Sequence, residues 1–138
     1  MSGDERRIVW NKAAEKDFRS FPDEVRSSFR KALEEARQGK HPSIAAPYGQ
    51  PLGKGYFKLK DDEQGSTYRG IYCVRYKEAI YVLHAFQKKS KSGKADPSEE
   101  VNTAKVRAKW AEMEHGLWEL DHGTPQKGNV SRMRGGKR

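Results

Sequence analysis

Hydrophobic positions recur along the N-terminal third of this chain at helical spacing, after a short β-prone run at residues 8–10. Asn11, a good N-cap residue, begins a stretch in which Ala14, Phe18 and Phe21 share one helical face. A second helix is predicted from Pro22 to about Gly39, with one apolar stripe made of Val25, Phe29, Ala32, Leu33 and Ala36. This pattern predicts a strand followed by a helical hairpin that packs on a core. A membrane-surface or partner helix is the less favoured reading of that stripe.

The middle of the chain changes to a strand-like pattern. Residues 39–55 contain three prolines and four glycines, which predicts a long connection without regular structure of its own. Three β-rich segments follow at 56–60, 67–76 and 79–86, separated by a polar turn at 61–66 and a tight reversal at Lys77-Glu78. We expect an antiparallel meander in a sheet of three or four strands.

A last helix is predicted to begin at Asp96-Pro97-Ser98-Glu99, which has the residues of a capping box, and to end near Gly116. It carries two apolar stripes. We expect the bulkier one to pack on the sheet; it consists of Val106, Trp110, Met113 and Leu117. The smaller stripe is expected to meet another helix, of this chain or of a partner; it consists of Val101, Ala104, Ala108 and Ala111.

Length and composition indicate a single α+β domain. The chain has 138 residues, of which 34% are hydrophobic, and this is room for one modest core. Beyond residue 118 the composition changes to Gly, Pro, Asn, Ser and basic residues. We therefore expect a folded domain at 1–118 and a basic, mobile tail at 119–138.

Compartment signals are few, and they agree with one another. The longest nearly apolar run, 80–86, is far too short to cross a bilayer, and the charged N-terminus does not resemble a secretory signal. Cys73 is the single cysteine, so no intramolecular disulfide can form. We expect a cytoplasmic protein.

The net charge indicates a class of partner. There are 28 Lys and Arg residues against 19 Asp and Glu residues, a net charge of +9, which favours a polyanionic partner. RNA, DNA and acidic proteins all fit, and so does the plainer reading that the lysines only keep a small domain soluble.

Strand periodicity then gathers the basic side chains. Alternation places Lys58 and Lys60 on one face of their strand, and neighbouring strands bring Arg69 and His84 near them. A basic loop follows the last strand, with Lys88, Lys89, Lys91 and Lys94. Such a face suits metal-independent cleavage of an RNA phosphodiester, which needs a base for the ribose 2′-hydroxyl, donors for the phosphate and an acid for the leaving 5′-oxygen.

Roles can be assigned by chemical type. Arg69 suits a phosphate contact. Lys58 or Lys60 is a candidate base because neighbouring cations disfavour protonation of a lysine, and His84 is suited to either proton transfer. The alternative is that the lysines form a solvated face and that His84 is a hydrogen-bonded structural residue. From spacing alone both readings stay open.

Other chemistries find little support. The chain has no cysteine pair or His-x-x-x-His cluster for a metal and no glycine-rich phosphate-binding fingerprint, so we expect neither a metal nor another cofactor. Cys73 lies in a predicted strand and is expected to be a small buried residue.

Three segments resemble the phage-derived, HigB-like branch of the RelE/ParE toxin superfamily: PLGKGYFKLK (51–60), YRGIY (68–72) and, most specifically, VLHAFQKK (82–89). The resemblance covers roughly residues 8–115, and the order of predicted elements agrees with it. It implies a RelE/ParE-like α+β fold, with an N-terminal strand and helical hairpin, a three-stranded antiparallel meander and a C-terminal helix packed on the sheet.

The resemblance also implies a function. It implies the toxin of a type II toxin–antitoxin system, a metal-independent endoribonuclease that cleaves translated mRNA on the ribosome. The implied catalytic residues are Lys58, Lys60, Arg69, His84 and Lys88. Lys88 stands where RelE has Arg, and no late tyrosine follows Tyr81. Further RNA or ribosome contacts are expected at Lys54, Lys89, Lys91 and Lys94.

The implied partners are the ribosome, mRNA and a cognate antitoxin, which we expect to be a helix-turn-helix DNA-binding protein. Operator DNA would be bound only through this antitoxin. For the antitoxin contact we expect the stripe with Val101, Ala104 and Ala108. Two alternatives remain open: a ParE-like toxin that inhibits DNA gyrase without being an enzyme, and a basic RNA- or ribosome-binding module without catalysis. The residues gathered around Arg69 favour the nuclease over the gyrase inhibitor.

Overall fold

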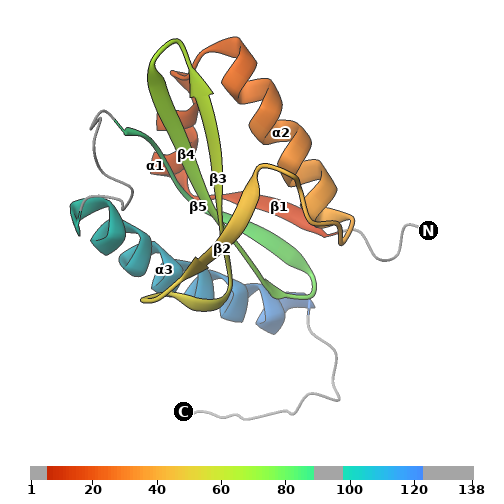
Figure 1. Ribbon diagram of the computed structural model, residues 1–138. Coiled ribbons are helices and arrows are strands. Elements are labelled where there is room, and N and C mark those ends of the chain that lie inside the picture. Colours follow the sequence, from red (N-terminus) through yellow and green to blue (C-terminus); the bar gives the residue numbers. More distant parts are fainter. Residues whose placement is uncertain (1–5, 89–97, 123–138) are drawn as a thin grey trace.

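The computed structural model describes residues 6–88 and 98–122. In chain order its elements are β1 (Arg7–Trp10), α1 (Lys12–Arg19), α2 (Asp23–Arg37), β2 (Ala45–Gly49), β3 (Gly53–Glu63), β4 (Ser66–Tyr76), β5 (Ala79–Lys88) and α3 (Ser98–His122). The strands form one sheet, with the α1–α2 hairpin on one face and α3 across the other (Figure 1). The α+β fold predicted from the sequence is confirmed.

The helical hairpin forms as its pattern predicts. The side chain of Asn11 accepts hydrogen bonds from the backbone amides of Ala13 and Ala14, which satisfies donors at the start of α1. The predicted stripe of α2 is wholly buried and packs with Phe18 and Phe21 against the sheet; it consists of Val25, Phe29, Ala32, Leu33 and Ala36. Core packing, rather than membrane or partner binding, accounts for this stripe.

The sheet has five strands in the order β1-β5-β4-β3-β2, so the expectation of three or four strands is wrong. The added strand is β2, which lies within the segment predicted to lack regular structure. Pro47 and the neighbouring glycines resemble a loop in sequence, but β2 is an edge strand that pairs only with β3, where a missing backbone donor is tolerated. At the other edge, β1 runs parallel to β5.

The β3–β4 hairpin turns at two residues rather than six. Gln64 and Gly65 both have positive φ angles, 51° and 83°, as the two central residues of a type I′ turn require. The strands therefore continue through the segment predicted as a polar turn, up to Glu63 and from Ser66. The tight turn fixes the register of the two strands. The predicted reversal at Lys77-Glu78 lies, as expected, between β4 and β5.

Apart from Trp110, which packs against the sheet edge-on to Tyr81, the stripes of α3 face the opposite way from our prediction. Ala104 and Ala111 are 0% and 1% exposed and pack on the sheet, whereas the bulky Val106, Met113 and Leu117 are exposed. The reason lies in the sheet, whose side of this interface is filled by large residues such as Tyr56, Tyr81 and Phe86, so the helix supplies small residues. The stripe chosen for the antitoxin, with Val101, Ala104 and Ala108, is thus largely covered by the protein's own sheet.

The last helix extends further than predicted. It ends at His122 rather than near Gly116, so residues 119–122 of the expected tail lie in its last turn. The rest of the expected tail, 123–138, and the predicted cap at Asp96 lie outside the described residues. Among residues 6–88 and 98–122, none of the helices has the length and apolar character that a bilayer crossing requires.

Candidate active site

The predicted basic cluster lies on the sheet face that α3 partly covers. Lys60 pairs with Arg69 across β3 and β4, and Arg69 pairs in turn with Phe86 of β5. In the neighbouring row Lys58 pairs with Ile71, which pairs with His84. Because directly opposite residues on neighbouring strands point to the same face, Lys58, Lys60, Arg69 and His84 share one surface, as the sequence predicted.

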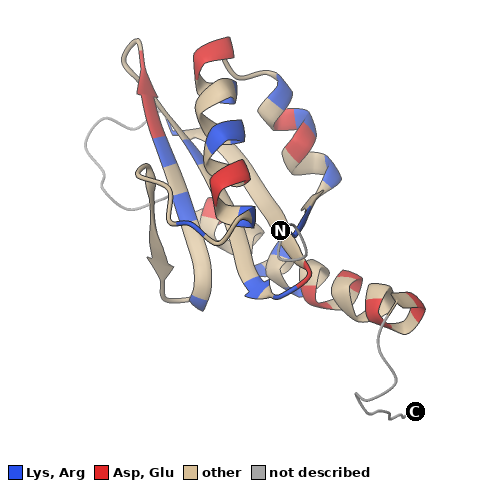
Figure 2. Ribbon diagram, turned by 90° about the vertical axis from the view of Figure 1, so that its right-hand side faces the viewer, with Lys and Arg blue, Asp and Glu red and all other residues tan. Residues whose placement is uncertain are grey.

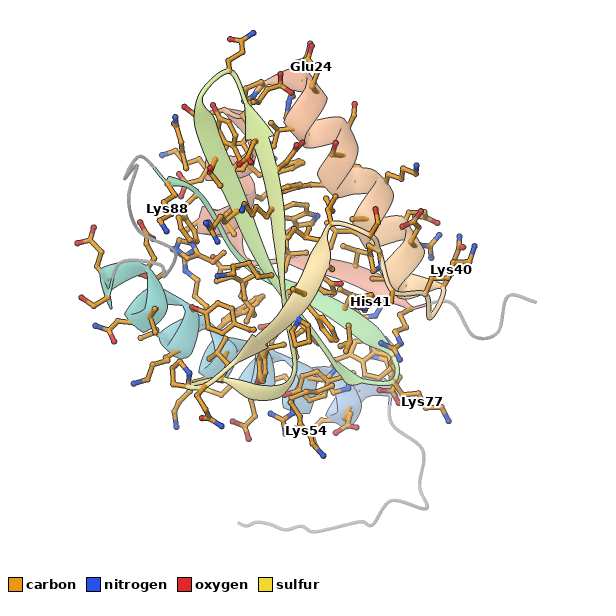
Figure 3. All side chains as sticks on the ribbon, in the orientation of Figure 1. Glu24, Lys40, His41, Lys54, Lys77 and Lys88 are labelled. Carbon is orange, nitrogen blue, oxygen red and sulfur yellow. The ribbon has the colours of Figure 1, made fainter. Side chains whose placement is uncertain are left out.

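Lys88 lies at the end of β5, where it pairs with Thr67. It lies two residues beyond Phe86, so strand alternation gives it the same face as Arg69. Figure 3 shows Lys88 above the first turns of α3, at the margin of the sheet. The structure therefore brings together the five predicted catalytic residues.

These five side chains differ in their access to solvent. Lys60 is exposed and Lys58 is half-buried, with its ammonium 5.3 Å from the centre of the Tyr48 ring of β2. Arg69 and Lys88 are buried. Lys60 is thus exposed to solvent, whereas Arg69 and Lys88 are buried where electrostatic interactions are less screened.

A β-bulge directs His84 to this face. Ile71 pairs with His84 but the next residue, Tyr72, pairs with Val82, so β5 has one extra residue, Leu83, at this point. Simple alternation would point Leu83 and His84 to opposite faces. The bulge places both toward α3, and bulges next to functional sites commonly redirect a side chain in this way.

Two residues of α3 hold the His84 ring. Its Nε2 lies 2.7 Å from Oε1 of Glu100, and its Nδ1 lies 3.2 Å from Nη1 of Arg107. A guanidinium can only donate, so Nδ1 accepts and the Nε2–H group donates to Glu100. The same Arg107 nitrogen also donates to the Leu83 carbonyl oxygen at 3.2 Å.

The electrostatics favour a neutral His84. Burial lowers its pKa, the positive charge of Arg107 adds to that shift, and the hydrogen bond to Glu100 opposes it. With both ring nitrogens bonded to α3 and the side chain buried, His84 is arranged to position the sheet against the helix. This arrangement does not favour the proton-transfer role expected for His84.

Glu100 and Arg107 were missed from the sequence. Their signal is the spacing of Glu100, Ala104, Arg107 and Ala111, which recur every three or four residues and so form the stripe of α3 that faces the sheet. Two charged members make this stripe look polar on a helical wheel. The signal that could have identified this stripe is a Glu and an Arg that alternate with alanines at helical spacing, together with a histidine in a strand.

The other predicted RNA contacts do not join the cluster within the described residues. Lys54 is exposed near the start of β3, six residues before Lys60, which is about 20 Å along an extended strand. Figure 3 shows Lys54 and Lys88 at well-separated places on the molecule. Lys89, Lys91 and Lys94 lie outside the described residues.

A second histidine cluster lies at the opposite end of α3. His115 is buried, with Nδ1 2.9 Å from the Tyr81 hydroxyl and Nε2 3.0 Å from a Glu78 carboxylate oxygen. A Glu119 oxygen lies 3.8 Å from the same nitrogen, so these three residues are the described group with ligand atoms near enough to hold a metal ion. Hydrogen bonds and a ring stacked on Tyr76 also suit a purely structural cluster that ties the β4–β5 turn to α3.

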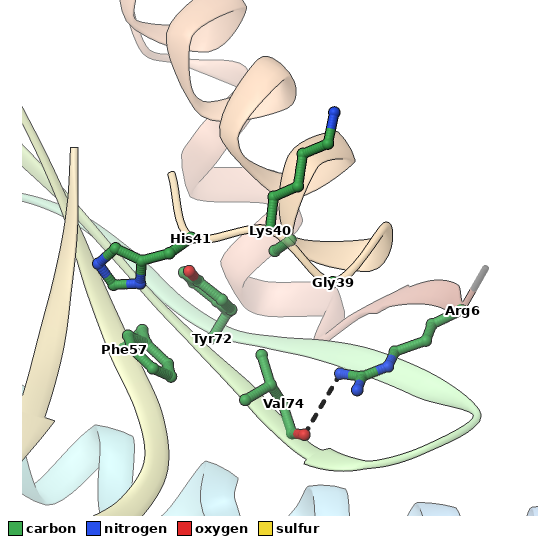
Figure 4. A pocket seen from close by; sticks show the side chains of 8 residues that line it. Arg6, Gly39, Lys40, His41, Phe57, Tyr72 and Val74 are labelled. Carbon is green, nitrogen blue, oxygen red and sulfur yellow. Dashed lines mark hydrogen bonds between the residues drawn. The ribbon is translucent and has the colours of Figure 1, made fainter. Parts of the chain in front are cut away.

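A cavity of about 210 Å³ opens on the other face of the sheet, beside the end of α2 (Figure 4). Its floor is formed by Phe57 and Tyr72, whose rings stack at 5.6 Å, with His41 edge-on to Phe57. Arg6 borders it and donates to the Val74 carbonyl oxygen at 3.3 Å. The sheet separates this cavity from the basic cluster, so it is not part of the predicted site.

Comparison with solved structures shows the fold. A doubly substituted variant of the E. coli toxin RelE in the free state is 24% identical, with a TM-score of 0.54, over 75% of this chain and 97% of that one. The isolated E. coli RelE toxin is 20% identical over 63% of this chain and 88% of that one, with a TM-score of 0.49. The RelBE2 toxin–antitoxin complex from Mycobacterium tuberculosis is 14% identical over 64% and 98%, with a TM-score of 0.44.

A search of curated proteins gives no significant match. The comparison with protein families gives a match over residues 16–109. This span includes every residue of the basic cluster as well as Glu100 and Arg107. The resemblance seen in the sequence is thereby confirmed at the level of the family. The chain belongs to the phage-derived Gp49-like protein family and has the RelE fold.

Proposed function

We propose that this protein is the toxin of a type II toxin–antitoxin system, an endoribonuclease that cleaves mRNA on the translating ribosome. The observation that carries the proposal is the register that places Lys60 beside Arg69, with Lys58 and Lys88 on the same face. Family membership supports it, because the matched span contains all of these residues. The net charge of +9 gives such a protein attraction for RNA.

The chemistry assigns each residue a task. Lys58 or Lys60 takes the proton from a ribose 2′-hydroxyl, and the resulting oxygen attacks the adjacent phosphorus. Arg69 donates hydrogen bonds to the phosphate oxygens, where negative charge accumulates in the transition state. Lys88 supplies a proton to the departing 5′-oxygen. The products are a 2′,3′-cyclic phosphate and a 5′-hydroxyl, and none of these steps calls for a metal.

His84, Glu100 and Arg107 have a different task in this scheme. They fix the first half of α3 against β5, and so set the position of the strand that ends in Lys88. We assign them as positioning residues. Such an enzyme would depend on the ribosome to hold the RNA in line for attack.

The proposal includes a cognate antitoxin of the helix-turn-helix DNA-binding type. The expected location of the protein is the cytoplasm, where translation occurs. The toxin would reach operator DNA only through the antitoxin. The stripe first chosen for the antitoxin contact packs largely on the sheet.

The test is primer-extension mapping of a defined mRNA incubated with the purified protein, with and without translating ribosomes. Cuts within the coding region only when ribosomes are present support the proposal. An intact message in both reactions contradicts it. Inhibition of DNA gyrase supercoiling would then indicate a ParE-like toxin, and ribosome binding without cleavage would indicate a binding module.

A further inference from the structure

α3 carries a row of large apolar side chains that the rest of the described structure leaves in solvent. Val106, Met113, Leu117 and Leu120 are 68%, 70%, 60% and 83% exposed. Together with the half-buried Trp110 they follow one another at intervals of four, three, four and three residues. That is the heptad spacing of a helix that packs against another helix, and we call these five residues the α3 stripe.

The α3 stripe needs a cover. Over its length, about 21 Å at 1.5 Å per residue, it exposes the kind of contiguous apolar surface that marks an interaction site. The segments of the chain outside the description, 1–5, 89–97 and 123–138, contain only Met1, Val130 and Met133 as large apolar residues. They offer no matching row. This favours a cover supplied by another molecule.

The charges beside the α3 stripe are arranged in two halves. Exposed Lys105 and Lys109 lie along its N-terminal half. Three exposed acidic residues lie along its C-terminal half: Glu112, Glu114 and Asp121. Figure 2 shows the acidic residues gathered toward the C-terminal end of α3.

A second copy of the same helix, running antiparallel, satisfies both patterns. Antiparallel pairing sets the basic half of one helix against the acidic half of the other, whereas parallel pairing would set like charges together. Val106 and Leu120 are each seven residues from Met113, so a two-fold axis at Met113 brings Val106 of one copy to Leu120 of the other.

We propose that this protein forms an antiparallel homodimer through the α3 stripe, with Met113 at the two-fold axis. Glu100 and Arg107, which hold His84, lie on the stripe of α3 that faces the sheet, so the dimer contact and the basic cluster use different faces of the helix. Most of the α3 stripe lies beyond residue 109, where the family match ends. This inference does not depend on the proposed ribonuclease activity.

The first experiment is sedimentation equilibrium of the full-length protein over a range of concentrations. We expect a concentration-dependent rise toward twice the chain mass of 15.8 kDa. Leu117→Lys places a charge in the α3 stripe at an exposed position and should weaken association at least tenfold. Ser27→Lys adds the same charge on the exposed face of α2 and should leave association unchanged. A monomer at every concentration, or equal effects of the two variants, would overturn the proposal.

Cysteine cross-linking tests the orientation. Met113→Cys should form a disulfide-linked dimer with itself under mild oxidation. Val106→Cys and Leu120→Cys should each stay monomeric alone but cross-link when mixed. The native Cys73 is buried and does not compete. Self-cross-linking at all three positions would indicate parallel pairing and overturn the antiparallel arrangement. If the protein stays monomeric and its α3 stripe is buried only when an antitoxin binds, the homodimer proposal is overturned.

Discussion

His84 of β5 and Glu100 of α3 meet through a hydrogen bond of 2.7 Å between Nε2 and Oε1, with Arg107 on the other ring nitrogen. This contact joins the strand that ends at Lys88 to the first turns of the helix that covers the sheet face. A side chain expected to transfer protons is thus placed where it holds two elements together.

Acidification should weaken this contact. Because burial lowers the pKa of His84 below its ordinary 6.5 in the folded state, the unfolded chain binds more protons between the two values, and the free energy of unfolding falls as the pH drops through that range. His84→Gln keeps a donor for Glu100 and an acceptor for Arg107 but does not titrate. Urea unfolding at pH 7 and pH 5 should therefore show a smaller loss in the variant than in the parent protein. Equal losses would contradict this reading of His84.

Arg69 should be needed for cleavage rather than for ribosome binding. Arg69→Ala removes the donors to the phosphate, and loss of such transition-state donors typically lowers the rate by about 10²- to 10³-fold. Arg69→Lys, which keeps the charge but loses the planar two-pronged geometry, should recover part of the rate. The measurement is single-turnover cleavage on programmed ribosomes beside ribosome cosedimentation. Loss of both activities together would favour a binding module.

One of the two neighbouring lysines should act as the base. Lys58→Met and Lys60→Met keep the length of the side chain, and the variant that lacks the base should lose about 10²- to 10⁴-fold in cleavage rate and its dependence on pH. Lys77→Met is the matched control, because Lys77 is exposed in the β4–β5 turn (Figure 3). If neither Lys58→Met nor Lys60→Met differed from this control, the base would be another group.

Lys54 should contribute to binding without affecting the chemical step. Its distance along β3 from Lys60 puts it outside the proposed reacting centre. Lys54→Met should lower ribosome affinity and reduce the salt dependence of binding by about one phosphate contact, while the single-turnover rate at saturation stays unchanged. A fall in the saturated rate would place Lys54 closer to the chemistry than the fold indicates.

The packing of α3 can be checked through stability. Ala104 is fully buried against the sheet, so Ala104→Leu should destabilise the protein by about 1–3 kcal/mol through overpacking. Lys31→Ala, at an exposed position of α2, should change stability by less than about 0.5 kcal/mol. Thermal or urea denaturation compares the two. A tolerated Ala104→Leu would restore our first assignment of the two α3 stripes.

The sequence pattern predicted a feature correctly where that feature depends mainly on residues nearby in the chain. The Asn11 cap, the α2 stripe and the shared face of Lys58 and Lys60 all follow from spacing. Edge strand β2 was not predicted because its Pro47 is typical of a loop. A proline is tolerated there only because β2 lies at the edge of the sheet.

Spacing along the chain was enough to predict the fold class and the face that the basic residues share, because strand alternation is a local property. The family followed from the resemblance of three segments. Tertiary structure alone decided the bulge at Leu83, the orientation of α3 and the partners of His84. These depend on how the volumes of two packed surfaces match: bulky sheet residues require small helix residues at Ala104 and Ala111, which turns the apolar Met113 side of α3 to the solvent.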